Sequence, residues 1–128
     1  MFACVLENKP SGHVFGANEL LNPGFETELC VRLGRGLEGA VTEEQIRAAI
    51  DAIHPPFEII ETRGDLVKQM ALALADNGQQ RSVVIGAPVR LSPSMALDQT
   101  IVRVQLNGQE VAPGLGSAVL GNPLNSIK

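Results

Sequence analysis

The sequence predicts an α+β fold with a mixed, mostly β core and two or three short helices. Three observations carry this prediction. Apolar and polar residues alternate over 25–33 and 100–106 with the period of two that strands require. An Asn-Gly dipeptide at 107–108 is the turn most typical of a two-residue β-hairpin. Thr42 and Gln45 have capping-box spacing ahead of apolar residues at helical intervals.

Length and composition limit the classes of protein to consider. A chain of 128 residues has room for one domain, which we expect to span 1–128. Its core must be aliphatic, because it has four Phe and no Trp or Tyr. A net charge of −4 and the lack of stacking aromatics argue against nucleic acid as a partner. No apolar run reaches the roughly 18 residues needed to span a bilayer, so we expect no membrane partner.

The two cysteines help to predict the cellular compartment of the protein. Cys4 and Cys30 show neither CxxC spacing nor histidine companions. Reduced, buried thiols in a cytoplasmic protein are the favoured interpretation, and a disulfide between them is the alternative. The absence of a recognisable leader favours the same location.

The first candidate site lies on Asn22–Leu33, which we predict to be one strand that begins at a Pro-Gly turn. Its odd-numbered residues form a core face, and Glu26 and Glu28 share the other face with Cys30 and Arg32. Two carboxylates at i and i+2 are close enough to hold one hard cation. The alternative is an ordinary solvated face on which Arg32 balances the acids.

A third carboxylate strengthens the cation hypothesis. Pro55-Pro56 ends the helix predicted from Thr42 to Ile53, and Phe57–Thr62 is predicted to be a strand. Glu58 lies in its middle, among apolar neighbours, where an uncompensated carboxylate is costly. Glu61 falls on the opposite face and is expected to be solvated.

The stretch Gly34–Gly39 formally matches GxGxxG, but the helix starts too late for its N-terminus to meet a pyrophosphate. We interpret it as a flexible connection. The remaining expected elements follow in order: a helix over 66–75 capped by Asp65 and ended at 76–78, a strand over 82–86, a loop over 88–97, a hairpin over 100–112, and a last short helix that begins at Asn122-Pro123.

Five segments and the first three residues match those of one protein family, and they occur in the same order along the chain. They are MFA at 1–3, PGFETEL at 23–29, PFEIIETR at 56–63, ADN at 75–77, VIG at 84–86 and GSAVLGNPLN at 116–125. With these segments the chain resembles the 2-keto-4-pentenoate hydratase branch of the fumarylacetoacetase family, which includes oxalocrotonate decarboxylases. The resemblance implies a fumarylacetoacetase-like fold, shortened at both ends.

The resemblance implies that Glu26, Glu28 and Glu58 bind magnesium or manganese, in agreement with an oxygen-only ligand set. In the family the metal chelates the carboxylate and 2-oxo oxygens of a 2-oxo acid and stabilises the enolate. The expected activity is hydration or decarboxylation of small 2-oxo or 2-hydroxydienoic acids.

A second set of residues matches a segment expected to border the substrate pocket: Ser117, Leu120, Gly121 and Pro123. Asp76 and Asn77 match a motif near that pocket, and a helix-ending turn explains them equally well.

The departures from the family leave alternatives open. The lysine and acidic residue that the family uses for proton transfer have no counterparts here, so no catalytic acid or base is assigned. Lys9 is expected in an exposed loop, and His13 and His54 as turn or surface residues. The alternative function is a non-catalytic module that binds a metal and 2-oxo acids, or a structural module that oligomerises. In each case we expect a homo-oligomer, because shortened sheets leave edges and apolar patches to cover.

Overall fold

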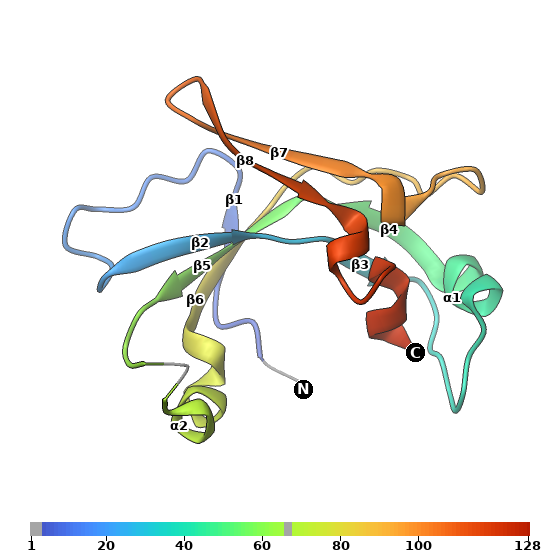
Figure 1. Cartoon of the computed structure of the whole chain (residues 1–128), viewed down its shortest axis with the longest axis horizontal. Coiled ribbons are helices and arrows are strands. Elements are labelled where there is room, and N and C mark those ends of the chain that lie inside the picture. Colours follow the sequence, from blue (N-terminus) through green and yellow to red (C-terminus); the bar gives the residue numbers. More distant parts are fainter. Residues whose placement is uncertain (1–3, 66–67) are drawn as a thin grey trace. The chain divides into compact units, whose positions relative to one another are not determined.

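The computed structural model describes residues 4–65 and 68–128 (Figure 1). The matched residues 1–3 and the first expected residue of the second helix, Leu66, lie outside this part. Contacts divide the chain into two compact units, Met1–Glu28 with Pro55–Ala87 and Leu29–His54 with Pro88–Lys128. Strands predominate in both units, and the helices are short, as expected for a mostly β α+β chain. The organisation as one domain stays a prediction.

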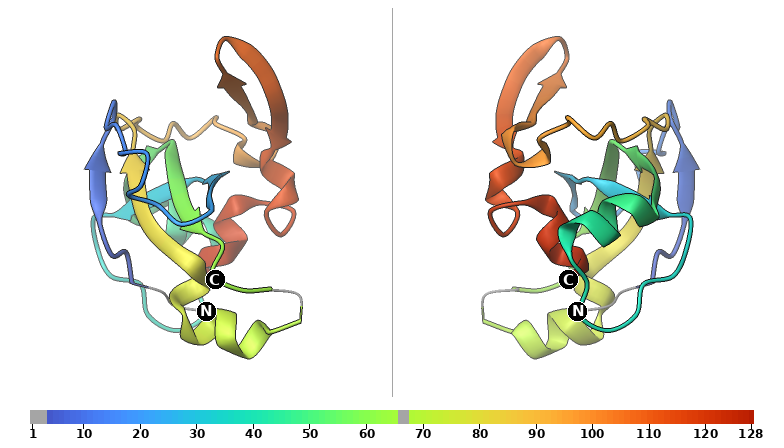
Figure 2. Two further views of the ribbon diagram at one scale, coloured as in Figure 1. Left: turned by 90° about the vertical axis from the view of Figure 1, so that its left-hand side faces the viewer. Right: turned by 90° about the vertical axis from the view of Figure 1, so that its right-hand side faces the viewer.

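The first unit is built on a four-stranded sheet with the order β1-β6-β5-β2. Its strands are β1 (Asn8–Pro10), β2 (Pro23–Thr27), β5 (Pro56–Glu61) and β6 (Gln80–Ile85). β1 runs parallel to β6, and the other neighbours are antiparallel, so the sheet is mixed. Helix α2 (Met70–Ala75) and the 3₁₀ turn η1 (Asn77–Gln79) lead into β6, and α2 lies at the end of the sheet where β6 begins (Figure 2).

The second unit contains two antiparallel strand pairs, β3 (Cys30–Leu33) with β4 (Ile50–His54) and β7 (Ile101–Leu106) with β8 (Gln109–Leu115). Its helical segments are α1 (Glu43–Ala49), η2 (Leu97–Gln99), η3 (Gly116–Ala118) and η4 (Pro123–Ile127). The buried core of this unit is aliphatic, as the composition predicts. It consists of Ile46, Ile53, Leu97 and Leu124.

Local sequence signals explain several element boundaries. Thr42 Oγ1 accepts from the Gln45 N–H at 3.2 Å, and Gln45 Oε1 accepts from the Thr42 N–H at 2.8 Å, which confirms the capping box of α1. Asn107 and Gly108 both have positive φ, 53° and 81°, as the tight turn between β7 and β8 requires. Asn122 caps η4, with Pro123 at its first position.

The prediction of one strand over Asn22–Leu33 is wrong. The segment forms β2 and β3, which pair with β5 and β4 in different sheets. The alternation continues across the break at Glu28-Leu29, so periodicity alone could not reveal it. The expected core face is also only partly a core: Leu29 and Val31 pack on the buried cluster, whereas Phe25 remains 47% exposed.

Both helices are shorter than predicted. The first ends at Ala49, and its expected last turn is β4, because β-branched Ile50 and Ile53 pair with β3. The second begins at Met70. Asp65 does not cap it: the residue before the helix is Gln69, and the Asp65 side chain accepts from the Lys68 N–H at 3.2 Å.

Other expectations about single residues also need correction. Cys4 is exposed and Cys30 is intermediate, so neither free thiol is buried. His54 is buried in β4 and is not a surface residue. Lys9 lies in β1, with its side chain 23% exposed and paired with Glu7 at 3.0 Å, and not in an exposed loop. None of the helices in the described part of the chain is both long and apolar enough to cross a membrane.

Candidate metal centre

Three carboxylates meet on one face of the sheet in the first unit. Glu26 of β2 lies directly opposite Glu58 of β5 in the antiparallel register. Glu28 comes one residue after the end of β2, and its N–H donates to the Pro56 carbonyl at 3.3 Å, so the backbone pairing extends to it. Because side chains alternate along a strand, Glu26 and Glu28 point to the same side as Glu58.

The spacing of the three side chains suits one cation. One oxygen from each of Glu26, Glu28 and Glu58 lies within 4.8 Å of the other two. Two oxygens on opposite sides of one ion are separated by about 4.2 Å for Mg²⁺ and about 4.8 Å for Ca²⁺, and by less when they are adjacent. The donor set therefore fits a hard divalent cation, and the role of these residues as metal ligands stays a prediction.

Burial and mutual repulsion both act on the acids of this cluster. Burial raises the pKa of Glu28, and the negative charges of Glu58 and Glu26 raise it further. Burial also raises the pKa of Glu58, with a further contribution from the charge of Glu26. A divalent cation would remove both causes, because it replaces lost solvation and neutralises like charges.

The basic side chains of this unit are paired with other acids. The ion pairs of its described residues join Lys9 and Arg81 to Glu7, Arg63 to Glu61 and Asp76, and Lys68 to Asp65. None of these pairs includes a carboxylate of the cluster. Glu26 and Glu28 are exposed, as the alternative of a solvated face expects, but Arg32 does not balance them, because it belongs to β3 and pairs with Asp51.

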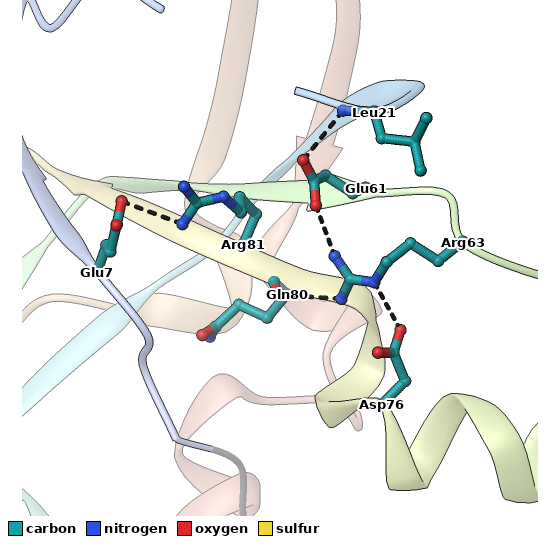
Figure 3. A network of polar contacts seen from close by, with 7 residues as sticks. All are labelled: Glu7, Leu21, Glu61, Arg63, Asp76, Gln80 and Arg81. Carbon is teal, nitrogen blue, oxygen red and sulfur yellow. Dashed lines mark hydrogen bonds and ion pairs between the residues drawn. The ribbon is translucent and has the colours of Figure 1, made fainter. Parts of the chain in front are cut away.

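Glu61 has a different environment from the cluster, although it was expected to be solvated. It accepts from the Leu21 N–H at 3.0 Å and from Arg63 Nη1 at 2.7 Å (Figure 3). These contacts, led by the backbone bond from Leu21, lower the pKa of Glu61. Arg63 also donates to Asp76 Oδ2 at 2.8 Å, so Asp76 ties the end of α2 to β5.

Sequence reasoning missed Gln80, the first residue of β6. Its side chain opposes the rise in the pKa of Glu58 that burial causes, so it lies close to that carboxylate. Gln80 is only 6% exposed. Gln79 and Gln80 lie between a predicted helix end and a predicted strand. Buried positions there are ordinarily apolar, so these two polar residues could have indicated a role for Gln80.

The residues expected to border a substrate pocket lie in the second unit. Ser117 is in η3, and Pro123 is buried at the start of η4. Leu120 and Gly121 have φ of 49° and 79°, and the Leu120 side chain is 69% exposed. The Asn125 side chain donates to the Leu120 carbonyl at 2.9 Å, which fixes this unusual backbone. Their role in substrate binding stays a prediction.

Asn77 serves the fold of the first unit. Its side chain accepts from the Cys4 N–H at 3.0 Å and donates to the Cys4 carbonyl at 2.8 Å. The structure thus supports the interpretation of the Asp76-Asn77 pair as a helix-ending turn, with both side chains in structural contacts.

Comparisons with known proteins agree on one family. The chain is 32% identical over 108 residues to a 4-oxalocrotonate decarboxylase from Pseudomonas sp., with 84% of this chain and 41% of the relative covered. It is 34% identical over 110 residues to a 2-hydroxyhexa-2,4-dienoate hydratase from Comamonas testosteroni, covering 84% of this chain and 42% of that protein. No protein-family model matches the chain.

A solved structure gives the same result for the fold. The 4-oxalocrotonate decarboxylase from Pseudomonas putida G7, complexed with magnesium and adipate, matches with a TM-score of 0.82 and 31% identity. The match covers 94% of this chain and 46% of that chain. The chain thus spans slightly less than half the length of these relatives. Its curated homologues and this structural match are hydratases and decarboxylases of the 2-keto-4-pentenoate hydratase and 4-oxalocrotonate decarboxylase type in the fumarylacetoacetase family, which the chain matches at about 30% identity.

Proposed function

We propose that the protein binds Mg²⁺ or Mn²⁺ through Glu26, Glu28 and Glu58 and acts on small 2-oxo or 2-hydroxydienoic acids by hydration or decarboxylation. The observation that carries this proposal is the convergence of three carboxylate oxygens within 4.8 Å on one face of a sheet. The Pseudomonas putida G7 decarboxylase has been solved complexed with magnesium and adipate and with calcium and acetate, which supports a divalent cation and a carboxylate as ligands.

The chain's own residues have a binding role in this proposal. β2 and β5 hold Glu26 and Glu58 in register, and the Glu28 N–H bond to Pro56 keeps the third carboxylate on the same face. A cation bound there would supply Lewis-acid stabilisation of the negative charge that develops on a 2-oxo acid. Ser117, Leu120, Gly121 and Pro123 are proposed to contact the substrate. The proposal assigns proton transfer to no residue.

Turnover assays test the catalytic part. The protein with Mg²⁺ or Mn²⁺ should consume a 2-hydroxydienoic acid, measured as loss of the dienol absorbance. Glu58→Gln should abolish this loss, whereas Glu61→Gln, which alters a carboxylate of the same strand outside the cluster, should retain it if the variant folds. Cation binding without turnover would instead support the alternative, a non-catalytic module that binds a metal and 2-oxo acids.

Self-association is also proposed, with a second copy of the chain as the partner. A two-stranded ribbon is marginally stable alone, yet β7 and β8 expose Ile101, Leu106 and Val111 by more than half. Arg103 and Glu110 pair at 3.2 Å and are the charged residues of these two strands, so the hairpin has no net charge. Two copies of the hairpin could therefore meet without like-charge repulsion, and symmetric dimers are the commonest assemblies.

A cytoplasmic location remains part of the proposal. It rests on the two cysteines, which are free in the structure.

A further inference from the structure

The side chain of Gln80 lies among the carboxylates of the proposed metal centre. Gln80 pairs with Ile60 across β5 and β6, after an irregularity between Ile59 and Ile60. Glu58 is two residues before Ile60 and so shares its face. Gln80 is therefore a diagonal neighbour of Glu58 on the carboxylate face, within the reach of a long side chain.

The orientation of the Gln80 amide is determined by its neighbours. Gln80 Oε1 accepts from the main-chain N–H of Leu6 at 3.0 Å. Since that N–H can only donate, the amide oxygen must face Leu6, and the amide NH₂ is the group left for the Glu58 carboxylate. The effect of Gln80 in lowering the pKa of Glu58 agrees with this assignment.

The backbone of Gln80 is held from the other side. Arg63 Nη2 donates to the Gln80 carbonyl at 3.3 Å, while Arg63 itself is fixed by Glu61 and Asp76. Figure 3 shows the Gln80 side chain extending away from Arg63, toward the segment that carries Glu7. The residue is thus anchored at both its main chain and its amide oxygen, which leaves one oriented donor.

We propose that Gln80 is a positioning residue of the metal centre, whose amide NH₂ holds the Glu58 carboxylate in the orientation that binds the cation. The proposal rests on the proposed cation site and adds a residue outside its three ligands. A fixed donor is suited to this task because it favours the ionised carboxylate and limits its rotation, without competing for the metal. The Leu6 N–H contributes to this positioning, since it orients the Gln80 amide.

The test is the affinity for Mn²⁺ alone, measured by calorimetry and by the electron paramagnetic resonance signal of free Mn²⁺. Gln80→Met keeps the length of the side chain but removes its donor and acceptor, and we expect about tenfold weaker binding. The matched control is Gln79→Met. Gln79 is equally buried, at 3% exposure, but donates to the Gly64 carbonyl at 3.1 Å. The control should bind Mn²⁺ like the wild type, even if it is less stable.

A second pair of variants leaves Gln80 unchanged and keeps the test valid if Gln80→Met does not fold. Leu6→Pro removes the N–H that orients the amide, and Val5→Pro places the same ring one residue earlier while retaining that N–H. We expect a severalfold loss of Mn²⁺ affinity for Leu6→Pro and a smaller loss for Val5→Pro.

The outcomes separate this inference from the function on which it rests. If Gln80→Met folds and binds Mn²⁺ as tightly as Gln79→Met, Gln80 has no positioning role, although the metal centre stands. Equal affinity of Leu6→Pro and Val5→Pro would overturn the orienting role of the Leu6 N–H. If the wild type itself does not bind Mn²⁺, the metal centre fails, and the positioning role fails with it.

Discussion

Glu26 and Glu58 lie directly opposite each other on the neighbouring strands β2 and β5. Like charges in this relationship destabilise a sheet, because the two side chains start from adjacent backbone positions. Glu28 adds a third negative charge within 4.8 Å of both. A sheet with this arrangement is expected to lose stability at neutral pH without a cation and to regain it when a cation binds.

Removal of one charge should therefore stabilise the metal-free protein. Glu58→Gln keeps the size of the side chain and abolishes its repulsion with Glu26, so we expect a gain of about 0.5 kcal/mol in the free energy of unfolding. Chemical denaturation in the presence of a chelator measures this change. Glu61→Gln is the control: it removes an acceptor of the Arg63 and Leu21 bonds and should destabilise. A loss of stability in Glu58→Gln would contradict the account of repulsion.

The metal-free protein should also become more stable as the pH falls from about 7 toward the ordinary Glu range. The pKa values of Glu28 and Glu58 are raised in the folded state above the ordinary Glu value of 4.5, so the folded protein takes up protons first. Below that range the trend reverses. The pKa of Glu61 is lowered, so the unfolded chain then binds the proton that folded Glu61 excludes.

Thermal melts at successive pH values, with a chelator, measure this dependence. With saturating Mn²⁺ the Tm should instead fall as the pH drops from about 7 toward the ordinary Glu range, because cation binding requires ionised carboxylates. In the double variant Glu28→Gln/Glu58→Gln, the Tm of the metal-free protein should no longer increase as the pH falls from neutral to the ordinary Glu range. If the Tm of the double variant still increases, groups other than Glu28 and Glu58 cause the increase.

The Arg63 cluster should stabilise the first unit. Arg63 donates to Glu61, Asp76 and the Gln80 carbonyl, and its side chain is 27% exposed. Arg63→Met should cost about 1–2 kcal/mol of unfolding free energy, because several partners lose a charged donor at once. The control is Arg32→Met, whose side chain is 57% exposed and pairs with Asp51. It should cost less than about 0.5 kcal/mol. Equal costs would argue against a cooperative cluster.

The exposed hairpin should control self-association. Val111→Lys places a charge on an apolar position of β8 that is 52% exposed. If a second copy covers this ribbon, sedimentation velocity should show the wild type as a dimer or larger and Val111→Lys shifted toward the monomer. The control is Val14→Lys, an 85% exposed position in the first unit, which should sediment like the wild type. A monomeric wild type would refute the proposal of self-association.

Short-range signals predicted much of the fold. The capping box at Thr42 and Gln45 and the turn at 107–108 depend on neighbouring residues only, and both are confirmed. The division of Asn22–Leu33 between two sheets was not predictable, because it depends on pairing with β4 and β5, far along the chain. The β-branched Ile50 and Ile53 fitted the helical period, and pairing with β3 placed them in a strand.

The candidate site was also only partly predictable, because its geometry depends on strand pairing between distant segments. Alternation placed Glu26 and Glu28 on one face, and the apolar surroundings singled out Glu58, so the sequence could nominate all three carboxylates. Their convergence required the register of β2 against β5. Gln80 was missed because its contact with Glu58 depends on the irregularity near Ile59, which shifts the partner in β6.

A thermal melt with and without Mn²⁺ and oxalate tests whether Glu26, Glu28 and Glu58 form a cation site. The proteins to compare are the wild type and Glu26→Gln/Glu28→Gln. A ligand that binds only the folded form, at about 100 times its Kd, stabilises by roughly 2.7 kcal/mol. The Tm of the wild type should rise clearly, and more so with oxalate, whereas that of the double variant should not rise. An unchanged Tm in the wild type, or an equal rise in both proteins, would rule out a cation site at these carboxylates.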